Sequence, residues 1–143
     1  MTSLRLLTAG CAAVAAALLL TPSPARAADP LAQAVARGAH MFAHDTFWGS
    51  NNMTCESCHL GGGKVKGRLP NGKVLPSLVN AAAIYPRVSH GKVKTLSQQI
   101  RHCVRDGLGG NAPAYGSADL ADMIAYLGSI AHGQPVDIGG KKK

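Results

Sequence analysis

The stretch MTCESCHLGGGK, residues 53–64, places two cysteines three positions apart with a histidine directly after the second. On one turn of helix, the thiols of Cys55 and Cys58 can reach the two vinyl groups of a porphyrin. His59, one step further round the turn, can direct its imidazole at the iron. The spacing therefore predicts one covalently attached haem c, held through Cys55 and Cys58, with His59 as an iron ligand.

Three other interpretations use the same residues. A thioredoxin-like redox pair requires a βαβ setting, and the sequence shows no convincing strand. A zinc site made of Cys55, Cys58, His59 and Cys103 would require two adjacent ligands to converge on one ion, which structural zinc spacing avoids. A disulfide between Cys55 and Cys58 would close a very tight loop and leave His59 without a role. Covalent haem accounts best for all three residues of the motif.

The N-terminal residues have the layout of a secretory signal. Arg5 precedes an apolar run that ends at Leu20, and the small-residue pattern ARA ends at Ala27. This order predicts a cleaved signal peptide over residues 1–27 and a periplasmic protein. A lipoprotein signal ending at Cys11 is the alternative, but it would leave almost no apolar segment before the cysteine. The run is also too short for a comfortable membrane span, so no stable membrane insertion is expected.

Cleavage after Ala27 would leave 116 of the 143 residues, enough for one domain. Loss of Arg5 and Arg26 from the 15 basic residues leaves 13 against 7 acidic ones, a net charge of about +6. This charge favours an acidic redox partner protein, small anions or a membrane surface over nucleic acid. We expect a cytochrome c domain over 28–136 and a disordered basic tail over 137–143, which ends in GGKKK.

Helix caps and apolar residues spaced three or four apart indicate a mainly helical chain. Asp29 is expected to cap the first helix, and Thr95 forms a capping box with Gln98. A turn is expected at Asn71-Gly72. The loops are long for so small a domain, which is typical of a chain that wraps a cofactor. The expected helices are 29–45, 79–85, 95–107 and 117–133.

These features resemble the small class I c-type cytochromes. In that family the first and last helices cross where a glycine lets the backbones approach, as Gly38 and Tyr126 would here. The segment LPSL, residues 75–78, is similar to the family's proline loop. The resemblance implies an all-α, class I cytochrome c-like fold of three to five helices around one haem. It also implies that the Pro76 carbonyl accepts a hydrogen bond from the ring N–H of His59.

The usual second axial ligand of that family, a methionine in the loop before the last helix, is missing from this chain. Met123 lies inside the last predicted helix, on a face needed for packing. The other donors between the attachment motif and that helix are His90, His102 and Cys103. His90 lies in a basic loop and is expected to be solvated. His102 and Cys103 are adjacent, so they point about 100° apart on a helix.

Cys103 shares a face with the apolar residues Leu96 and Ile100, which predicts that its side chain points inward. It can therefore be a buried, inert thiol or the second axial ligand. The basic neighbours Arg101 and Arg105 favour the thiolate, the form that binds metals. With the methionine missing, we interpret Cys103 as the ligand.

From Gly38 to Leu127 the sequence resembles the catalytic haem domain of thiosulfate dehydrogenases, and more distantly the haem-bearing subunit of the Sox sulfur-oxidation system. The resemblance rests on CESCHLGGG, Tyr85-Pro86, GKVKTL and the helix that carries Cys103, which occur in the same order. It implies that Cys103 binds the iron opposite a histidine, and that Arg87 and Arg101 hold an anionic sulfur substrate. Those dehydrogenases carry a second haem domain, whereas this chain contains one haem motif.

Two functions remain open at this point. The first is a periplasmic monohaem cytochrome that only transfers electrons, which we prefer because one haem suffices. The second is the oxidation of thiosulfate or another small sulfur anion, with Cys103 as a displaceable ligand or sulfur acceptor. Under that second function Cys103, Arg101 and Arg87 are the candidate catalytic residues. A sensing or gas-binding role would use the same haem.

Overall fold

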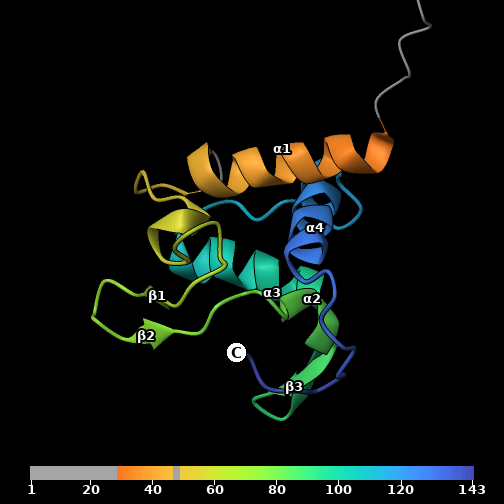
Figure 1. Cartoon of the computed structure of the whole chain (residues 1–143). Helices are drawn as coiled ribbons and strands as arrows, with labels where there is room; N and C mark the ends of the chain where they lie inside the picture. The colour runs from red at the N-terminus through yellow and green to blue at the C-terminus, as the bar shows by residue number, and fades with distance from the viewer. Residues whose placement is uncertain (1–28, 47–48) are drawn as a thin grey trace, which may run out of the picture.

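The computed structural model describes residues 29–46 and 49–143, so the predicted signal peptide, residues 1–27, lies outside the described residues. The chain is mainly helical (Figure 1). Two short antiparallel hairpins are also present, which the sequence analysis did not predict. None of the helices in the described ranges is long and apolar enough to cross a membrane. The helices are α1 (Pro30–His44), a 3₁₀ turn η1 (Cys55–Ser57), α2 (Ala81–Ile84), α3 (Leu96–His102), a π-helical turn η2 (Cys103–Gly107) and α4 (Ala118–Ile130).

Helix α1 crosses α4 at the top of the molecule in the view of Figure 1. A Cβ atom on Gly38 would lie 2.7 Å from the carbonyl carbon of Asp122 and 2.8 Å from Cβ of Tyr126. Only a glycine permits this approach, as expected. Arg37 strengthens the crossing because its Nε and Nη2 donate to the two carboxylate oxygens of the buried Asp122, at 2.6 and 3.0 Å.

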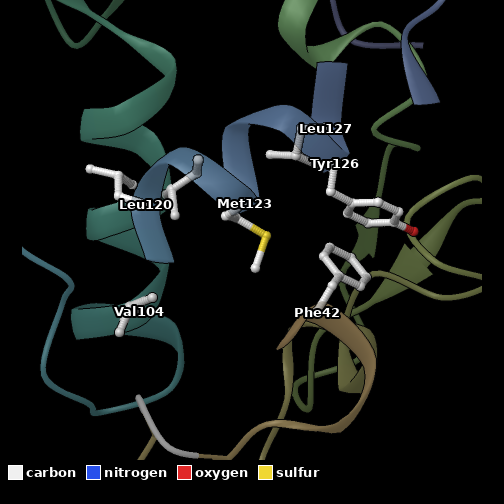
Figure 2. Close-up of a cluster of buried hydrophobic side chains, with 7 residues drawn as sticks. Phe42, Val104, Leu120, Met123, Tyr126 and Leu127 are labelled. Carbon is white, nitrogen blue, oxygen red and sulfur yellow. The ribbon is translucent and has the colours of Figure 1, made fainter. Parts of the chain in front are cut away.

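The hydrophobic core is a cluster of buried side chains, most of them on α4 (Figure 2). Met123 points from α4 into its centre and is only 2% exposed. Burial of an apolar side chain of this size contributes roughly 1.5–3 kcal/mol. The seven buried members of this cluster come from α1, α3, η2 and α4, and they are Phe42, Ile100, Val104, Leu120, Met123, Tyr126 and Leu127.

The predicted N-caps at Asp29 and Thr95 are confirmed, whereas the short helix expected over 79–85 begins at Ala81. The Asp29 side chain accepts a hydrogen bond from the Leu31 N–H, at 3.0 Å. Thr95 and Gln98 form the predicted capping box. The expected helix over 95–107 differs at its end, because its last turn is π-helical and the Leu108 N–H donates to the Cys103 carbonyl at 3.1 Å. Such π turns occur often at functional sites.

The two hairpins join strands of only two or three residues. Strand β1 (Gly67–Arg68) pairs with β2 (Val74–Leu75), and β3 (Arg87–Ser89) pairs with β4 (Lys92–Lys94). The predicted turn at Asn71-Gly72 connects the first pair, with Gly72 in the left-handed region at φ +85°. The tip of the second hairpin contains His90, which is exposed as expected.

Residues 137–143 form a segment that we call the C-terminal strap. The Asp137 N–H donates to the Ala83 carbonyl and the Gly139 N–H to the Ile84 carbonyl, both at 3.0 Å. Asn80 then binds the end of the strap through the Lys141 carbonyl, at 2.9 Å. This arrangement differs from the disordered basic tail expected for these residues, because backbone partners on α2 and its N-cap hold the strap against the domain.

Candidate haem site

A cavity of about 410 Å³ borders the hydrophobic core, and several core side chains line it. This volume lies within the range of roughly 300–1,000 Å³ that is typical of small-molecule and cofactor sites. Most of its surface is apolar, as a porphyrin requires. Its apolar lining consists of Phe42, Leu69, Leu75, Leu78, Ala81, Tyr85, Leu96, Ile100, Val104, Leu108, Met123 and Leu127.

One side of the cavity, which we call the attachment wall, is formed by residues 55–63. Cys55, Cys58 and His59 all line the cavity, and both cysteines are free thiols. The His59 N–H donates to the Cys55 carbonyl at 3.0 Å, and the Arg68 N–H donates to the Cys58 carbonyl at 3.0 Å. The attachment turn is therefore fixed by its own backbone and by strand β1.

The glycines after the motif tie this wall to the rest of the domain. The Gly62 N–H donates to Oε1 of Glu56 at 3.0 Å, and the Gly62 carbonyl accepts from the Tyr126 hydroxyl at 2.8 Å. The Leu78 N–H donates to the Gly63 carbonyl at 2.7 Å. Residues 61–63 all have positive φ, a backbone conformation that favours glycine.

The pKa values of Cys55, Cys58 and His59 are all shifted in the direction that favours the neutral side chain. Burial raises the pKa of the Cys55 thiol to about 12, and the nearby Cys103 adds to this effect. Burial also raises the pKa of Cys58. Burial, followed by the positive charge of Lys142, lowers the pKa of His59. Neutral imidazole is the form that binds a metal, so His59 has the protonation state of an iron ligand.

The predicted hydrogen bond from His59 to the Pro76 carbonyl is not formed in the structure. The Nδ1 atom of His59 is buried and has no hydrogen-bond partner within the described ranges. Pro76 follows strand β2 and is not among the residues that line the cavity. A buried imidazole nitrogen without a partner is costly, which fits a site completed by a bound group.

The other side, the cysteine wall, is formed by residues 96–108. Cys103 lines the cavity together with Leu96 and Ile100, which agrees with the predicted inward face of α3. The Nε2 amide of Gln99, one turn earlier, donates to Sγ of Cys103 at 3.2 Å. His102 also borders the cavity, although it was expected to point sideways, but its Nδ1 pairs with the Asp106 carboxylate.

Neither predicted arginine lines the cavity. Arg101 points to the other side of α3, where its guanidinium donates to the Pro113 carbonyl and lies 4.2 Å from the ring centroid of Tyr115. The structure therefore does not bring Arg101 to the cavity that contains Cys103. Arg87 begins strand β3, outside the cavity lining, but its charge acts on Tyr85 and on Lys142, which do line it.

Two residues of the site were missed by the sequence analysis. Gln99 has no signal except its position one turn before Cys103. Lys142 lies in the strap and lines the cavity. Burial lowers the pKa of Lys142, the charges of Arg87 and Lys94 lower it further, and Cys103 acts in the opposite direction. A lysine in the tail GGKKK gives no sequence signal that distinguishes it from its neighbours.

The arrangement of these side chains favours a haem site over the zinc site and the Cys55–Cys58 disulfide. No three His, Cys, Asp or Glu side chains in the described part of the chain lie close enough to share one metal ion, which disagrees with the four-ligand zinc site. Cys55 and Cys58 are not bonded to each other. The free thiols of Cys55 and Cys58, the buried imidazole of His59 and the sulfur of Cys103 surround one apolar cavity, and this set does fit a haem. The fold and the site therefore define a c-type cytochrome domain.

Comparisons with known proteins agree that this is a c-type cytochrome domain, and they identify its family. Residues 37–136 match the family described as SoxA/TsdA, cytochrome c domain. The chain belongs to this family, and it binds covalently attached haem c.

Curated relatives are similar over the same region. The chain is 33% identical over 88 residues to a thiosulfate dehydrogenase of Allochromatium vinosum, a match that covers 60% of this chain and 32% of that protein. It is 28% identical over 92 residues to the L-cysteine S-thiosulfotransferase subunit SoxA of Rhodovulum sulfidophilum, covering 63% and 28% respectively. These matches thus span a third or less of the length of the relatives.

Solved structures show the same fold. The thiosulfate dehydrogenase TsdBA from Marichromatium purpuratum has a TM-score of 0.63 and 26% identity, covering 86% of this chain and 28% of that one. SoxXA from P. pantotrophus has a TM-score of 0.62 at 23% identity, covering 77% and 37%.

Proposed function

We propose that this chain is a periplasmic monohaem cytochrome c that transfers electrons, with His59 and Cys103 as the axial ligands of its iron. The observation that supports this function is the convergence of His59 and Cys103, from separate elements, on the apolar cavity that also receives the thiols of Cys55 and Cys58. When bound, haem supplies reversible one-electron chemistry that no side chain here offers.

The chain's own residues attach, orient and insulate this group. Cys55 and Cys58 would form the two thioether bonds, and the apolar lining would exclude water. An anionic sulfur donor stabilises the ferric state, so Cys103 should give a lower reduction potential than a methionine ligand would. The exposed Lys64, Lys66 and Lys73 follow the attachment motif and suit an acidic redox partner.

A second candidate is the oxidation of a small sulfur anion beside Cys103. Two observations favour it, namely relatives named thiosulfate dehydrogenase and the cationic Lys142 in the same cavity as Cys103. In such a reaction two thiosulfate anions form one sulfur–sulfur bond and release two electrons, which an acceptor protein must take up. No proton is released.

Ligation can be tested by electron paramagnetic resonance of the oxidised holoprotein. Replacement of Cys103 by Met should change the low-spin signal and raise the midpoint potential. The matched control is Met123→Leu, which removes the methionine sulfur from the cavity lining and should leave both unchanged. A Cys103→Met spectrum identical to that of the unmodified protein would refute the assignment.

Turnover separates the two candidate functions. Thiosulfate and an artificial electron acceptor should give no sustained turnover if the chain is only an electron carrier. Turnover that Cys103→Gly abolishes would support the second candidate instead. Export is tested separately, because the mature protein purified from a periplasmic fraction should begin at Ala28.

A further inference from the structure

The C-terminal strap holds one particular lysine against the haem cavity. Asn80, which is 5% exposed, donates from Nδ2 to the Lys141 carbonyl at 2.9 Å, and its Oδ1 accepts from the Lys143 N–H at 3.3 Å. The Ser77 hydroxyl donates to the Lys143 carbonyl at 3.2 Å. Both neighbours of Lys142 are thus fastened to the domain, and Lys142 between them is half-buried and lines the cavity.

Lys142 differs from the other polar side chains that line the cavity. Gln99 donates to Sγ of Cys103, and His102 pairs with the Asp106 carboxylate. Within the described ranges, the Lys142 ammonium group forms neither a hydrogen bond nor a salt bridge with the protein. A charge at the edge of an apolar cavity is unfavourable unless a group of opposite charge or water reaches it. The protein itself places no carboxylate against this lysine.

The haem that this domain binds carries two carboxylates, which are the only charged groups on its rim. A carboxylate that accepts a hydrogen bond from an ammonium group satisfies both charges in one strong, short contact. Lys142 is the only lysine or arginine among the described residues that line the cavity. The cavity lining therefore contains one unpaired cation for a cofactor that brings anions.

We propose that Lys142 is a haem-binding residue whose ammonium group pairs with one carboxylate of the haem, and that this pair fastens the strap to the haem. The strap is then part of the haem site, because the carboxylate holds Lys142 while Asn80 and Ser77 hold the residues beside it. The proposal requires only the attached haem. It is independent of electron transfer and of iron ligation by Cys103.

The first test is resonance Raman spectroscopy of the ferric holoprotein, because the bending bands of the haem carboxylate groups respond to their hydrogen bonds. Lys142→Leu should shift one of these bands, and Lys142→Arg, which keeps a charged donor, should shift it less. Lys141→Leu is the matched control. It removes the same charge from the adjacent exposed position, keeps the carbonyl that Asn80 binds, and should leave the bands in place. Unchanged bands in Lys142→Leu would overturn the proposal.

The midpoint potential of the same variants is the second readout. Ferric haem carries one more positive charge than ferrous haem, so a nearby ammonium group opposes oxidation. Lys142→Leu should lower the midpoint potential and raise the ratio of oxidised to reduced protein at a fixed potential by roughly threefold. Lys142→Arg should stay near the unmodified value, and Lys141→Leu should change it little. A fall in Lys142→Leu without any change in the carboxylate bands would mean that the charge acts at a distance, and would overturn the pairing.

Hydrogen exchange of the holoprotein tests whether the haem fastens the strap. The Asp137 and Gly139 N–H groups donate to carbonyls of α2, so their exchange reports on strap opening. Both should exchange roughly threefold faster in Lys142→Leu, because one contact of the strap is lost. Exchange in Lys141→Leu should match the unmodified protein. Equal exchange in the two variants would overturn the link between strap and haem.

A small sulfur anion is the other group that Lys142 could meet in this cavity. Isothermal titration calorimetry of the ferric holoprotein with thiosulfate, without an electron acceptor, distinguishes the two. Any thiosulfate affinity should be the same in Lys142→Leu and Lys141→Leu, because the haem carboxylate already occupies Lys142. An affinity lost only in Lys142→Leu, with unchanged carboxylate bands, would assign this lysine to the second candidate function and overturn the proposal.

Discussion

The attachment wall and the cysteine wall of the cavity are built in different ways. Backbone hydrogen bonds within residues 55–68 fix the attachment wall, including those to the Cys55 and Cys58 carbonyls. The cysteine wall instead places Cys103, the first residue of η2, in the same cavity as Lys142, which lies on the strap 39 positions later in the sequence. The first wall is a local motif that the sequence displays directly, whereas the second exists only after the chain has folded.

The largest expected difference concerns covalent attachment. The double variant Cys55→Ala/Cys58→Ala should lose all covalently bound haem, because no other cysteines are adjacent on one turn. Cys103→Ala should keep it, because that thiol forms no thioether. Mass spectrometry of the denatured proteins measures the added mass. Haem attached in the double variant, or missing in Cys103→Ala, would contradict the assignment of the thioether bonds to Cys55 and Cys58.

The rigidity of the attachment wall predicts the next effect. In Gly67→Ala the new Cβ would lie 2.9 Å from the Cys58 carbonyl carbon and 3.1 Å from Cα of His59. This overpacking should lower the free energy of unfolding by about 1–3 kcal/mol, as measured by denaturant unfolding of the holoprotein. The control is Gly128→Ala in α4, where the new Cβ would meet no heavy atom within 4 Å beyond the neighbouring backbone of its own helix. It should be neutral or stabilise by up to about 1 kcal/mol.

A smaller effect is expected where the attachment wall meets α4. Tyr126→Phe removes the hydroxyl that donates to the Gly62 carbonyl at 2.8 Å. The expected loss is about 1–2 kcal/mol at neutral pH, because the carbonyl is left without this donor. Tyr115→Phe is the control, since that side chain is 61% exposed and keeps its ring against Arg101.

The Tyr126 contribution should depend on pH in a defined direction. Burial, followed by the negative charge of Glu56, raises the pKa of Tyr126 above its value in the unfolded chain. Its contribution is therefore complete below the unfolded pKa of about 10 and is lost as the pH rises through the folded pKa. Unfolding curves of the two proteins should converge in that alkaline range. A constant difference would contradict the role of the hydroxyl.

Local signals in the sequence were sufficient for much of the fold and for the attachment wall. CESCH fixes its own turn, and Asp29, Thr95 and Ser117 cap their helices through contacts two or three residues away. The hairpins were missed because strands of two or three residues are too short to show an alternating pattern. The all-α prediction omits them for that reason.

Residues that depend on distant contacts could not be placed in this way. Lys142 reaches the cavity because Asn80 binds both of its neighbours, a contact that no local pattern reports. Arg101 was associated with the site because it is close to Cys103 in sequence, yet it contacts Pro113 on another side of α3. Sequence proximity does not set direction on a helix.

The smallest expected effect concerns the sulfur of the cysteine wall. Gln99→Leu removes the amide that donates to Sγ of Cys103 at 3.2 Å. Without this donor more electron density remains on the sulfur, so the ferric state is stabilised and the midpoint potential should fall. A difference of about 1 kcal/mol between the two oxidation states corresponds to roughly 40 mV for one electron.

A double-mutant cycle shows whether this shift acts through the sulfur of Cys103. By potentiometric titration, Gln99→Leu should lower the midpoint potential when Cys103 is present. It should have almost no effect in the Cys103→Met background, because the hydrogen-bonded cysteine sulfur is then absent. An equal shift in both backgrounds would mean that Gln99 acts by changing polarity or packing in the cavity. A shift confined to the protein that contains Cys103 would identify Gln99 as the residue that positions and tunes this ligand, the counterpart on the cysteine wall of the backbone contacts that fix His59.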